Sequence, residues 1–361
     1  MRTIDTLTVL HTDREVGKLR LDPRTGCCVF KYSQSWLADG FSISPLKLQL
    51  TAETFIAPRE PFGGNFGVFE DSLPDGYGRY LLNRLLKREG IAESSLSPLQ
   101  RLSIVGGSGM GALRYVPESY VGEDKDMPSL DTLQRMALDV LSEKSAEDAD
   151  VLYFNSGNSG GCRPKCLLKD EEGDWLVKFR HTYDSQEIGA DEFECNRKAR
   201  ECGITVPDFK LIEGRYFASK RFDLDENRRP IHTVTAAGLL DASIQYPSLD
   251  YTTLLSLTGY LTQDSKQVEQ MFRRMVFNVL IENKDDHAKN FSFLCRNGKW
   301  ELAPAYDLTR VPAGYNGQHA TTVNNNGNPT EEDFLAAAES IRISRQRAVS
   351  IINEIKTALK S

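Results

Sequence analysis

The sequence predicts an α+β protein with a β-rich N-terminal subdomain and a mostly helical C-terminal lobe. Residues 3–60 form short apolar runs separated by turn residues, and residues 174–223 alternate between strand-like and helical patterns. Beyond residue 234 the periodicity is mainly helical, interrupted by one hairpin and by a polar loop at 316–328. Strand-rich runs followed by helix-rich runs are typical of this fold class.

Length and composition restrict the class of protein. A chain of 361 residues can hold two or more domains, and 40% hydrophobic with 26% charged residues is typical of a soluble globular protein. The formal net charge of -7 argues against a general nucleic-acid or membrane binder. The sequence contains neither a membrane-length apolar run nor the apolar core of a signal peptide, and its seven cysteines have no C-x-x-C spacing. We therefore expect a cytoplasmic protein with reduced thiols and no zinc site.

The N-terminal elements follow from turn signals and periodicity. Short strands before residue 33 are predicted to form an antiparallel meander, and a turn at 69–79 leads into a helix that ends near Gly90. The polar segment 118–128 is a candidate linker, and a helix follows it. We divide the chain into 1–125, 126–235 and 236–361. At the other end, Thr330 and Ser344 are predicted to cap two amphipathic helices.

Two glycine-rich stretches invite a nucleotide-binding interpretation. The first, at 106–111, lacks a G-K-[ST] ending and follows no clear strand, so we interpret it as a tight structural turn. The second combines hydroxyls, glycines and a cationic end: Ser156, Ser159, Gly160, Gly161 and Lys165. Such a loop suits contact between backbone amides and phosphate oxygens, although a plain surface loop explains its composition equally well.

A strand lysine and a helix acid come next along the chain. Lys178 projects from the predicted strand at 174–179, and Glu192 lies in the predicted helix at 187–203. A Lys–Glu pair between such a strand and helix positions nucleotide phosphates in kinases. A lone lysine on a strand is more often simply solvated.

The segment 283–294 concentrates polar residues between an amphipathic helix and a hairpin. Asp285 and Asn290 have the D-x-x-x-x-N spacing of a phosphoryl-transfer catalytic loop, and Asp307 follows the hairpin, where a second metal ligand stands in such enzymes. The alternative is a solvated helix-to-strand loop rich in turn-forming residues.

The serine/glycine loop, strand lysine, helix glutamate, D-x-x-x-x-N loop and later aspartate occur in one order that is hard to explain by chance. The chain resembles the HipA family of bacterial serine/threonine kinases, the toxin half of HipA–HipB-type toxin–antitoxin systems. The motifs that carry this resemblance are S-L-P-D-G (72–76), G-G-S-G-M-G-A-L (106–113), G-G-C-R-P-K (160–165), R-F-D (221–223), D-D-H-A-K-N-F-S (285–292) and L-A-P-A-Y-D-L (302–308). It covers most of the chain, and the last two motifs are the most specific.

The resemblance implies a protein-kinase-like fold and assigns roles in the loop. Asp285 would be the catalytic base that orients the acceptor hydroxyl, and Asn290 and Asp307 would hold Mg²⁺. His287 and Lys289 belong to the same catalytic loop. For His287, a place near the transferred phosphate and a loop-stabilising hydrogen bond remain equally open.

The resemblance also implies an ATP site. Lys178 would contact the α- and β-phosphates with Glu192 as its ionic partner, and Phe222 would line the adenine pocket. The loop residues Gly160, Gly161 and Lys165 would meet the phosphates. One departure is Lys220, which stands where many family members have a hinge acid. Because the hinge binds adenine largely through backbone groups, we expect nucleotide binding to persist.

Many members of this family autophosphorylate a serine in the loop, which switches off ATP binding. Counting back from Lys165, that position falls on Asn158, so Ser159 and Ser156 are the candidates here. The resemblance also implies a helix-turn-helix, HipB-like antitoxin as partner, with DNA reached only through it. The protein substrate stays unknown.

Two other functions remain open. The acceptor could be a small molecule, but enzymes of that kind usually carry H-x-D in this loop, and Asn283 stands in place of the histidine. The chain could also be a non-catalytic, kinase-like partner of a DNA-binding repressor. The complete set of Lys178, Asp285, Asn290 and Asp307 argues against that possibility.

Overall fold

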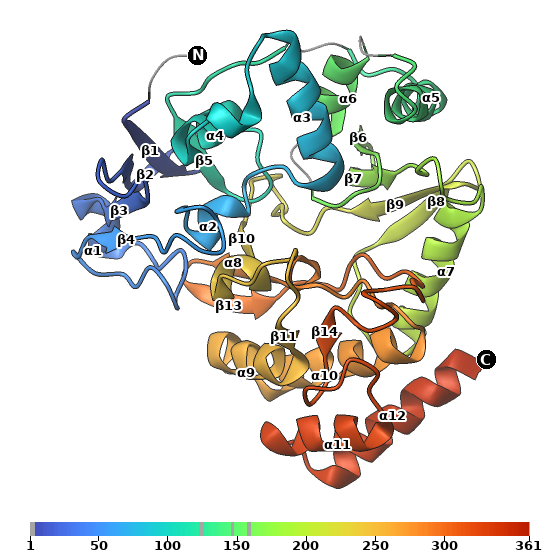
Figure 1. Cartoon of the computed structure of the whole chain (residues 1–361). Coiled ribbons are helices and arrows are strands. Elements are labelled where there is room, and N and C mark those ends of the chain that lie inside the picture. The colour runs from blue at the N-terminus through green and yellow to red at the C-terminus, as the bar shows by residue number, and fades with distance from the viewer. Residues whose placement is uncertain (1–3, 123–125, 146–147, 157–159, 361) are drawn as a thin grey trace.

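The computed structural model describes residues 4–122, 126–145, 148–156 and 160–360. Its N-terminal strands form an antiparallel sheet in the order β4-β3-β2-β1-β5 (Figure 1). Side chains alternate along β1, where Leu7 and Val9 are buried and Thr6 is exposed, so one face of the sheet enters the core. The strands are β1 (Thr6–His11), β2 (Arg14–Leu21), β3 (Cys28–Tyr32), β4 (Phe55–Ile56) and β5 (Leu113–Val116).

Helices connect and cover this part of the chain. The predicted helix after the turn at 69–79 is present, and its leucines at 81, 82, 85 and 86 are all buried. The helix at 98–105 begins with a reciprocal capping box between Ser97 and Gln100. The helices are α1 (Gln34–Asp39), α2 (Gly67–Glu70), α3 (Gly76–Arg88), η1 (Glu93–Ser95), α4 (Pro98–Val105), α5 (Leu130–Leu141) and α6 (Ala149–Ser156).

A second antiparallel sheet has the order β6-β7-β9-β8, and α7 packs beside it (Figure 1). Its elements are β6 (Lys165–Asp170), β7 (Gly173–Lys178), α7 (Ile188–Glu201), β8 (Phe209–Ile212) and β9 (Tyr216–Lys220). The first turn of α7 contacts the hairpin so closely that a Cβ on Gly189 would lie 1.9 Å from the carbonyl oxygen of Arg215. This close approach places Glu192, three residues later, within reach of Lys178 at the end of β7.

The C-terminal lobe is mainly helical and lies at the bottom of Figure 1. Its helices are α8 (Ala236–Leu240), α9 (Tyr251–Thr262), α10 (Ser265–Leu280), η2 (Ala288–Asn290), α11 (Glu331–Ser340) and α12 (Arg345–Lys360). The predicted hairpin, β12 (Ser292–Arg296) and β13 (Lys299–Leu302), joins β10 (His232–Thr235) in a small sheet. The short parallel pair β11 (Leu249–Asp250) and β14 (Thr321–Thr322) corrects the expectation of only loop and helix there. Such two-residue strands carry no periodic signal.

Two buried cores cross the boundaries predicted at 125 and 235, and that division stays a prediction. One core joins the first sheet to the C-terminal helices, with Leu7 and Phe30 in the same cluster as Met271 and Ile355. The other joins α3, α5 and α6 to the second sheet. Among the described residues, no helix is both long and apolar enough to cross a bilayer.

Candidate active site

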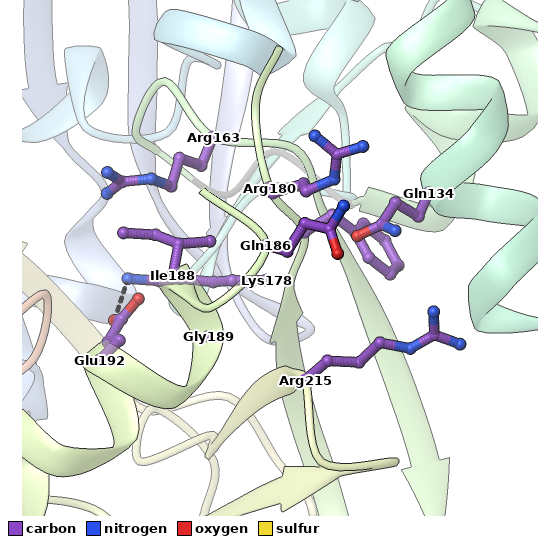
Figure 2. Close-up of a pocket in the computed structure, with 10 residues that line it drawn as sticks. Gln134, Arg163, Lys178, Arg180, Gln186, Ile188, Gly189, Glu192 and Arg215 are labelled. Atoms are coloured by element: carbon purple, nitrogen blue, oxygen red, sulfur yellow. Dashed lines mark hydrogen bonds and ion pairs between the residues drawn. The ribbon is translucent and has the colours of Figure 1, made fainter. Parts of the chain in front are cut away.

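Lys178, the last residue of β7, bridges two acids from distant parts of the chain. Its Nζ lies 2.5 Å from Glu192 Oε1 on α7 and 2.6 Å from Asp307 Oδ1 after the β12–β13 hairpin. The first of these ion pairs is drawn in Figure 2. The side chains of Lys178 and Glu192 are only 11% and 2% exposed, so water screens these contacts little. The predicted Lys178–Glu192 pair is present, and Asp307 joins it.

Burial and ion pairing act in opposite directions on these groups. Burial disfavours the charged form of Asp307, but the adjacent Lys178 outweighs it and holds the pKa of Asp307 well below its ordinary value. Burial opposes the charge of Lys178 as well, yet Asp307 and Glu192 together raise the pKa of Lys178 above its ordinary value. Lys178 and Asp307 are therefore both charged across the physiological pH range.

The predicted catalytic loop faces this ion pair. The side-chain amide of Asn290 donates from Nδ2 to the backbone oxygen of Asp285 at 2.9 Å, which closes the loop on itself. Burial raises the pKa of Asp285 above its ordinary value, His287 opposes this shift, and Asp307 adds to it. Asp307 has a φ of 55°, in the left-handed region that aspartate adopts more readily than most residues.

A cavity of about 240 Å³ contains nearly all of the predicted site residues in its wall. The second sheet, the glycine-rich loop and the C-terminal lobe all contribute to it. Predicted residues in the wall are Gly160, Gly161, Lys165, Lys178, Glu192, Phe222, His287, Lys289, Asn290 and Asp307. Asp285 lies next to this wall, through its contact with Asn290.

The N-terminal subdomain completes the cavity through residues that the sequence did not single out as site residues. Asp75, at the start of α3, accepts from Gly161 N at 2.5 Å and from Lys289 Nζ at 2.8 Å. The backbone N of Tyr77 donates to Gly161 O at 3.0 Å, so both sides of the Gly161 peptide are held. Asp75 occurs within the S-L-P-D-G motif, but no spacing relates it to residues 161 and 289.

A second N-terminal acid, Asp71, also lines the cavity. Its carboxylate accepts from Thr235 N at 2.7 Å and from Thr235 Oγ1 at 2.8 Å. Burial raises the pKa of Asp71 to about 6, although the charge of Lys289 acts in the opposite direction.

The predicted adenine side contains aromatic and backbone groups. The ring centroids of Phe222 and Tyr306 are 5.5 Å apart. Beside them, Arg221 pairs with Asp223 at 2.7 Å, and Met110 and Gly111 line the same cavity. Part of the glycine-rich stretch at 106–111, interpreted from the sequence as a tight structural turn, therefore lines the cavity.

Three further predicted residues have distinct environments. His287 lines the cavity, and its buried Nδ1 has no hydrogen-bond partner among the described residues, so that nitrogen does not stabilise the loop. Ser156 ends α6 and is 1% exposed, with its hydroxyl donating to Tyr153 O at 3.1 Å. Ser159 lies outside the described residues.

A smaller cavity of about 190 Å³ also has Lys178 and Glu192 in its wall (Figure 2). Its wall includes Arg163, Arg180 and Arg215, but two of these guanidinium groups already have acidic partners. Arg163 pairs with Asp184 at 2.9 Å and Arg215 with Glu213 at 3.1 Å. Figure 2 shows the guanidinium groups of Arg163 and Arg215 pointing in opposite directions. The cavity is a recess beside the ion pair, and the guanidinium groups of Arg163 and Arg215 in its wall are each paired with an acid.

Comparison with known proteins identifies the family. The model of the HipA-like C-terminal domain matches residues 157–361, which is more than half of the chain, and that of the HipA N-terminal domain matches residues 7–116. The chain belongs to the HipA family. The motifs at 72–76 and 106–113 therefore lie within the matched N-terminal domain, and the four motifs between 160 and 308 lie within the matched C-terminal domain.

The similar proteins differ in how much of their length is matched. A protein of Haemophilus influenzae named "Putative kinase" is 26% identical over 178 residues, which are 42% of this chain and 52% of that protein. The serine/threonine-protein kinase toxin HipA of Shewanella oneidensis is 23% identical over 353 residues, which are 86% of this chain and 77% of that protein. The chain thus spans only about half the length of the Haemophilus relative.

A solved structure confirms the fold. A chain in the Shewanella oneidensis MR-1 toxin–antitoxin complex of HipA, HipB and operator DNA superposes with a TM-score of 0.72 at 19% sequence identity. The match covers 97% of this chain and 88% of the other. The predicted α+β, kinase-like fold of the HipA type is therefore correct.

The Asp75–Lys289 ion pair is testable through stability. We expect Asp75→Asn to lower the free energy of unfolding by about 1–3 kcal/mol, because it leaves a largely buried ammonium group without its carboxylate. Lys289→Met should act in the same direction. The double variant should lose less than the sum of the two, by roughly 1–2 kcal/mol.

Urea unfolding followed by tryptophan fluorescence would measure these differences. The matched control is Glu93→Gln, which breaks the more exposed Arg79–Glu93 pair and should cost less than about 1 kcal/mol. Strict additivity of the Asp75 and Lys289 substitutions would mean that the two side chains do not interact energetically.

Proposed function

We propose that this HipA-family chain is an ATP-dependent serine/threonine protein kinase of the toxin type. The observation that carries the proposal is the shared ion pairing of Lys178 with Glu192 and Asp307, beside a loop that presents Asp285 and Asn290. A strand lysine, a helix glutamate, a metal-binding aspartate and a D-x-x-x-x-N loop are the groups that phosphoryl transfer from ATP requires.

The residues fit a nucleotide with its magnesium ion. Oxygen atoms that a hard cation prefers remain available, since Asp307 Oδ2 and Asn290 Oδ1 make no hydrogen bond within the described residues. The described residues also contain no cluster of three or more His, Cys, Asp or Glu side chains suited to a metal. Asn290 and Asp307 would therefore hold Mg²⁺ only together with the ATP phosphates as further ligands. The bound ion would neutralise phosphate charge.

The cationic side chains are arranged for the phosphates and the aromatic ones for the base. Lys178 and Lys165 both line the cavity, and Lys165 Nζ donates to Gly160 O, which keeps the lysine beside the glycine-rich loop. Phe222 and Tyr306 offer apolar surface to adenine at the other side. Lys289 is paired with Asp75, so it supports the loop while its charge remains near the phosphates.

Asp285 would act on the acceptor. The hydroxyl oxygen of a serine or threonine attacks the γ-phosphorus, the bond from phosphorus to the β,γ-bridging oxygen breaks, and ADP leaves with that oxygen. Asp285 accepts the hydroxyl proton as the new P–O bond forms. Its partly buried carboxylate has a raised pKa, which makes it a better base than an ordinary aspartate.

The roles of the two aspartates can be separated by substitution. We expect Asp285→Asn to lower kcat about 10²- to 10⁴-fold while Mg·ATP affinity changes little, because this residue acts on the acceptor. Asp307→Asn should instead weaken Mg·ATP binding, because it removes both a metal ligand and a partner of Lys178. Transfer from radiolabelled ATP and titration calorimetry measure the two quantities.

The matched control is Asp174→Asn on the same strand as Lys178, where the carboxylate pairs with Arg228 and takes no part in the site. That variant should transfer phosphate at the wild-type rate. Near-normal turnover by Asp285→Asn would rule out the assigned catalytic loop.

The raised pKa of Asp285 predicts the pH dependence. A general base acts in its deprotonated form, so kcat should fall as the pH drops through a value above the ordinary aspartate pKa of about 4. The pKa of Asp307 is held low by Lys178, so Mg·ATP affinity should persist through the pH range where kcat declines. If kcat and Mg·ATP affinity instead fell together as the pH dropped, the decline in kcat would be assigned to the nucleotide site and not to the base.

We further propose autophosphorylation in the glycine-rich loop, at Ser159 or Ser156. A phosphate there would add roughly -1.5 to -2 charge beside the phosphates of ATP and disfavour nucleotide binding by repulsion. The burial of Ser156 makes Ser159 the better acceptor. Phosphosite mapping of the same radiolabelling reactions tests this, and the phosphate should be absent from the Asp285→Asn protein.

We also propose a HipB-like, helix-turn-helix antitoxin as the partner. The Shewanella structure contains HipA, HipB and operator DNA, and the net charge of -7 gives this chain little affinity for DNA phosphates. Gel-shift titration at physiological salt should show no stable duplex binding by the chain alone. Adding the antitoxin should bring it into a DNA-bound complex. Sub-micromolar binding of DNA by the isolated chain would contradict an indirect route.

A further inference from the structure

The residue after the proposed catalytic base carries a second carboxylate with a different environment. Asp286 is fully buried, and its Oδ2 accepts from Tyr251 Oη at 2.9 Å and from His319 Nδ1 at 3.0 Å. Its Oδ1 accepts from the backbone N of Thr321 at 3.2 Å. Asp285 and Asp286 therefore point to different surroundings, one beside the nucleotide cavity and one in the interior of the lobe.

The hydrogen bonds around Asp286 continue as far as the turn that carries Asp307, a proposed Mg²⁺ ligand. Tyr251 Oη also accepts from Asn278 Nδ2 at 2.9 Å, and Asn278 Oδ1 accepts from Asn283 Nδ2 at 3.1 Å. The same Asn283 Nδ2 approaches the backbone oxygen of Asp307 at 3.4 Å. One buried set of hydrogen bonds thus runs from α9 through α10 to the turns that carry Asp285, the proposed base, and Asp307, a proposed Mg²⁺ ligand.

The backbone on either side of Asp285 is held by the segment that follows Asp307. Lys284 N donates to Val311 O at 3.3 Å, and Lys284 O accepts from Ala320 N at 3.1 Å. Thr321 Oγ1 donates to the backbone oxygen of Asp286. The carbonyl groups of Lys284 and Asp286, which flank Asp285, are therefore both held by residues 309–321, while the carbonyl of Asp285 itself accepts from Asn290.

A buried carboxylate is costly unless every oxygen finds a donor, and here three donors come from two separate parts of the chain, α9 and the segment 309–321. An apolar residue would fill the same space without that requirement. The hydrogen bonds do more than fill space, because they specify one orientation of the loop relative to α9 and to the segment 309–321.

We propose that Asp286, together with His319 and Tyr251, is a positioning group that sets the direction of the Asp285 carboxylate. It also couples the catalytic loop to the segment 309–321, so that the two move together. The three residues touch neither nucleotide nor acceptor and act only through the backbone of Asp285. The effect on turnover rests on the proposed kinase function, whereas the coupling between the two segments does not.

The variants His319→Leu and His319→Asn separate positioning from filling of the interior. Leucine removes the donor to Asp286, while the asparagine amide nitrogen occupies nearly the position of the histidine Nδ1 and keeps it. Tyr251→Phe removes the second donor with little change in shape. The matched control is Thr258→Val, which removes a buried hydroxyl of α9 that donates only to Leu254 O at 2.7 Å.

Three measurements are made on the full chain: kcat, Mg·ATP affinity and amide hydrogen exchange over residues 283–291. We expect His319→Leu and Tyr251→Phe to lower kcat about 10- to 100-fold, the size of effect that misplacing a catalytic group produces. Exchange should accelerate over 283–291 and over 309–321 together, while exchange in α7 stays unchanged and Mg·ATP affinity falls much less than kcat. His319→Asn should restore most of kcat, and Thr258→Val should resemble the wild type.

Two results would overturn the positioning role. One is a folded His319→Leu protein with wild-type kcat and exchange, and the other is equal damage from His319→Leu and His319→Asn, which would mean a purely steric requirement. If the wild-type chain transfers no phosphate, the kinase function fails. The exchange measurement then still tests whether Asp286 couples the two segments.

Discussion

The site depends on one buried cation shared by two acids. Lys178 comes from a sheet, Glu192 from a helix packed on that sheet and Asp307 from the C-terminal lobe, so one ammonium group ties three parts of the chain together. Removing Lys178 would leave two acids without their cation in a poorly hydrated place, and removing either acid would leave Lys178 with a single partner. The packing of α7 on the β8–β9 hairpin, through Gly189, matters for the site because it brings Glu192 within reach of Lys178.

Around that ion pair, neighbouring acids take different roles because of what surrounds them. Asp285 lies near the cavity with a raised pKa, while Asp286 is buried among donors and Asp307 is kept charged by Lys178. Asp75, which lies in the N-terminal subdomain, accepts hydrogen bonds from the backbone N of Gly161 and from Lys289. The chemistry is therefore set by burial and neighbouring charges more than by residue type.

Local sequence patterns predicted much of this arrangement. The D-x-x-x-x-N spacing, the strand lysine and the periodic helices are signals within a few turns of chain, and the structure brings those residues to one cavity. The contacts of Asp75 with Lys289 and of Asp286 with His319 span 214 and 33 residues, and no periodicity reports such distances. The short strands β11 and β14 were missed for the same reason, since their pairing is decided by tertiary packing.

The two buried cores do not follow the order of the chain. Strands from the first 32 residues share a core with helices that end at residue 360, while α3, α5 and α6 pack on the second sheet. The stretch matched by the C-terminal family model consequently lacks part of its own interior. Cut free at residue 157, it would present to water the apolar surface that β1 to β3 now cover, because the two family domains share one buried core.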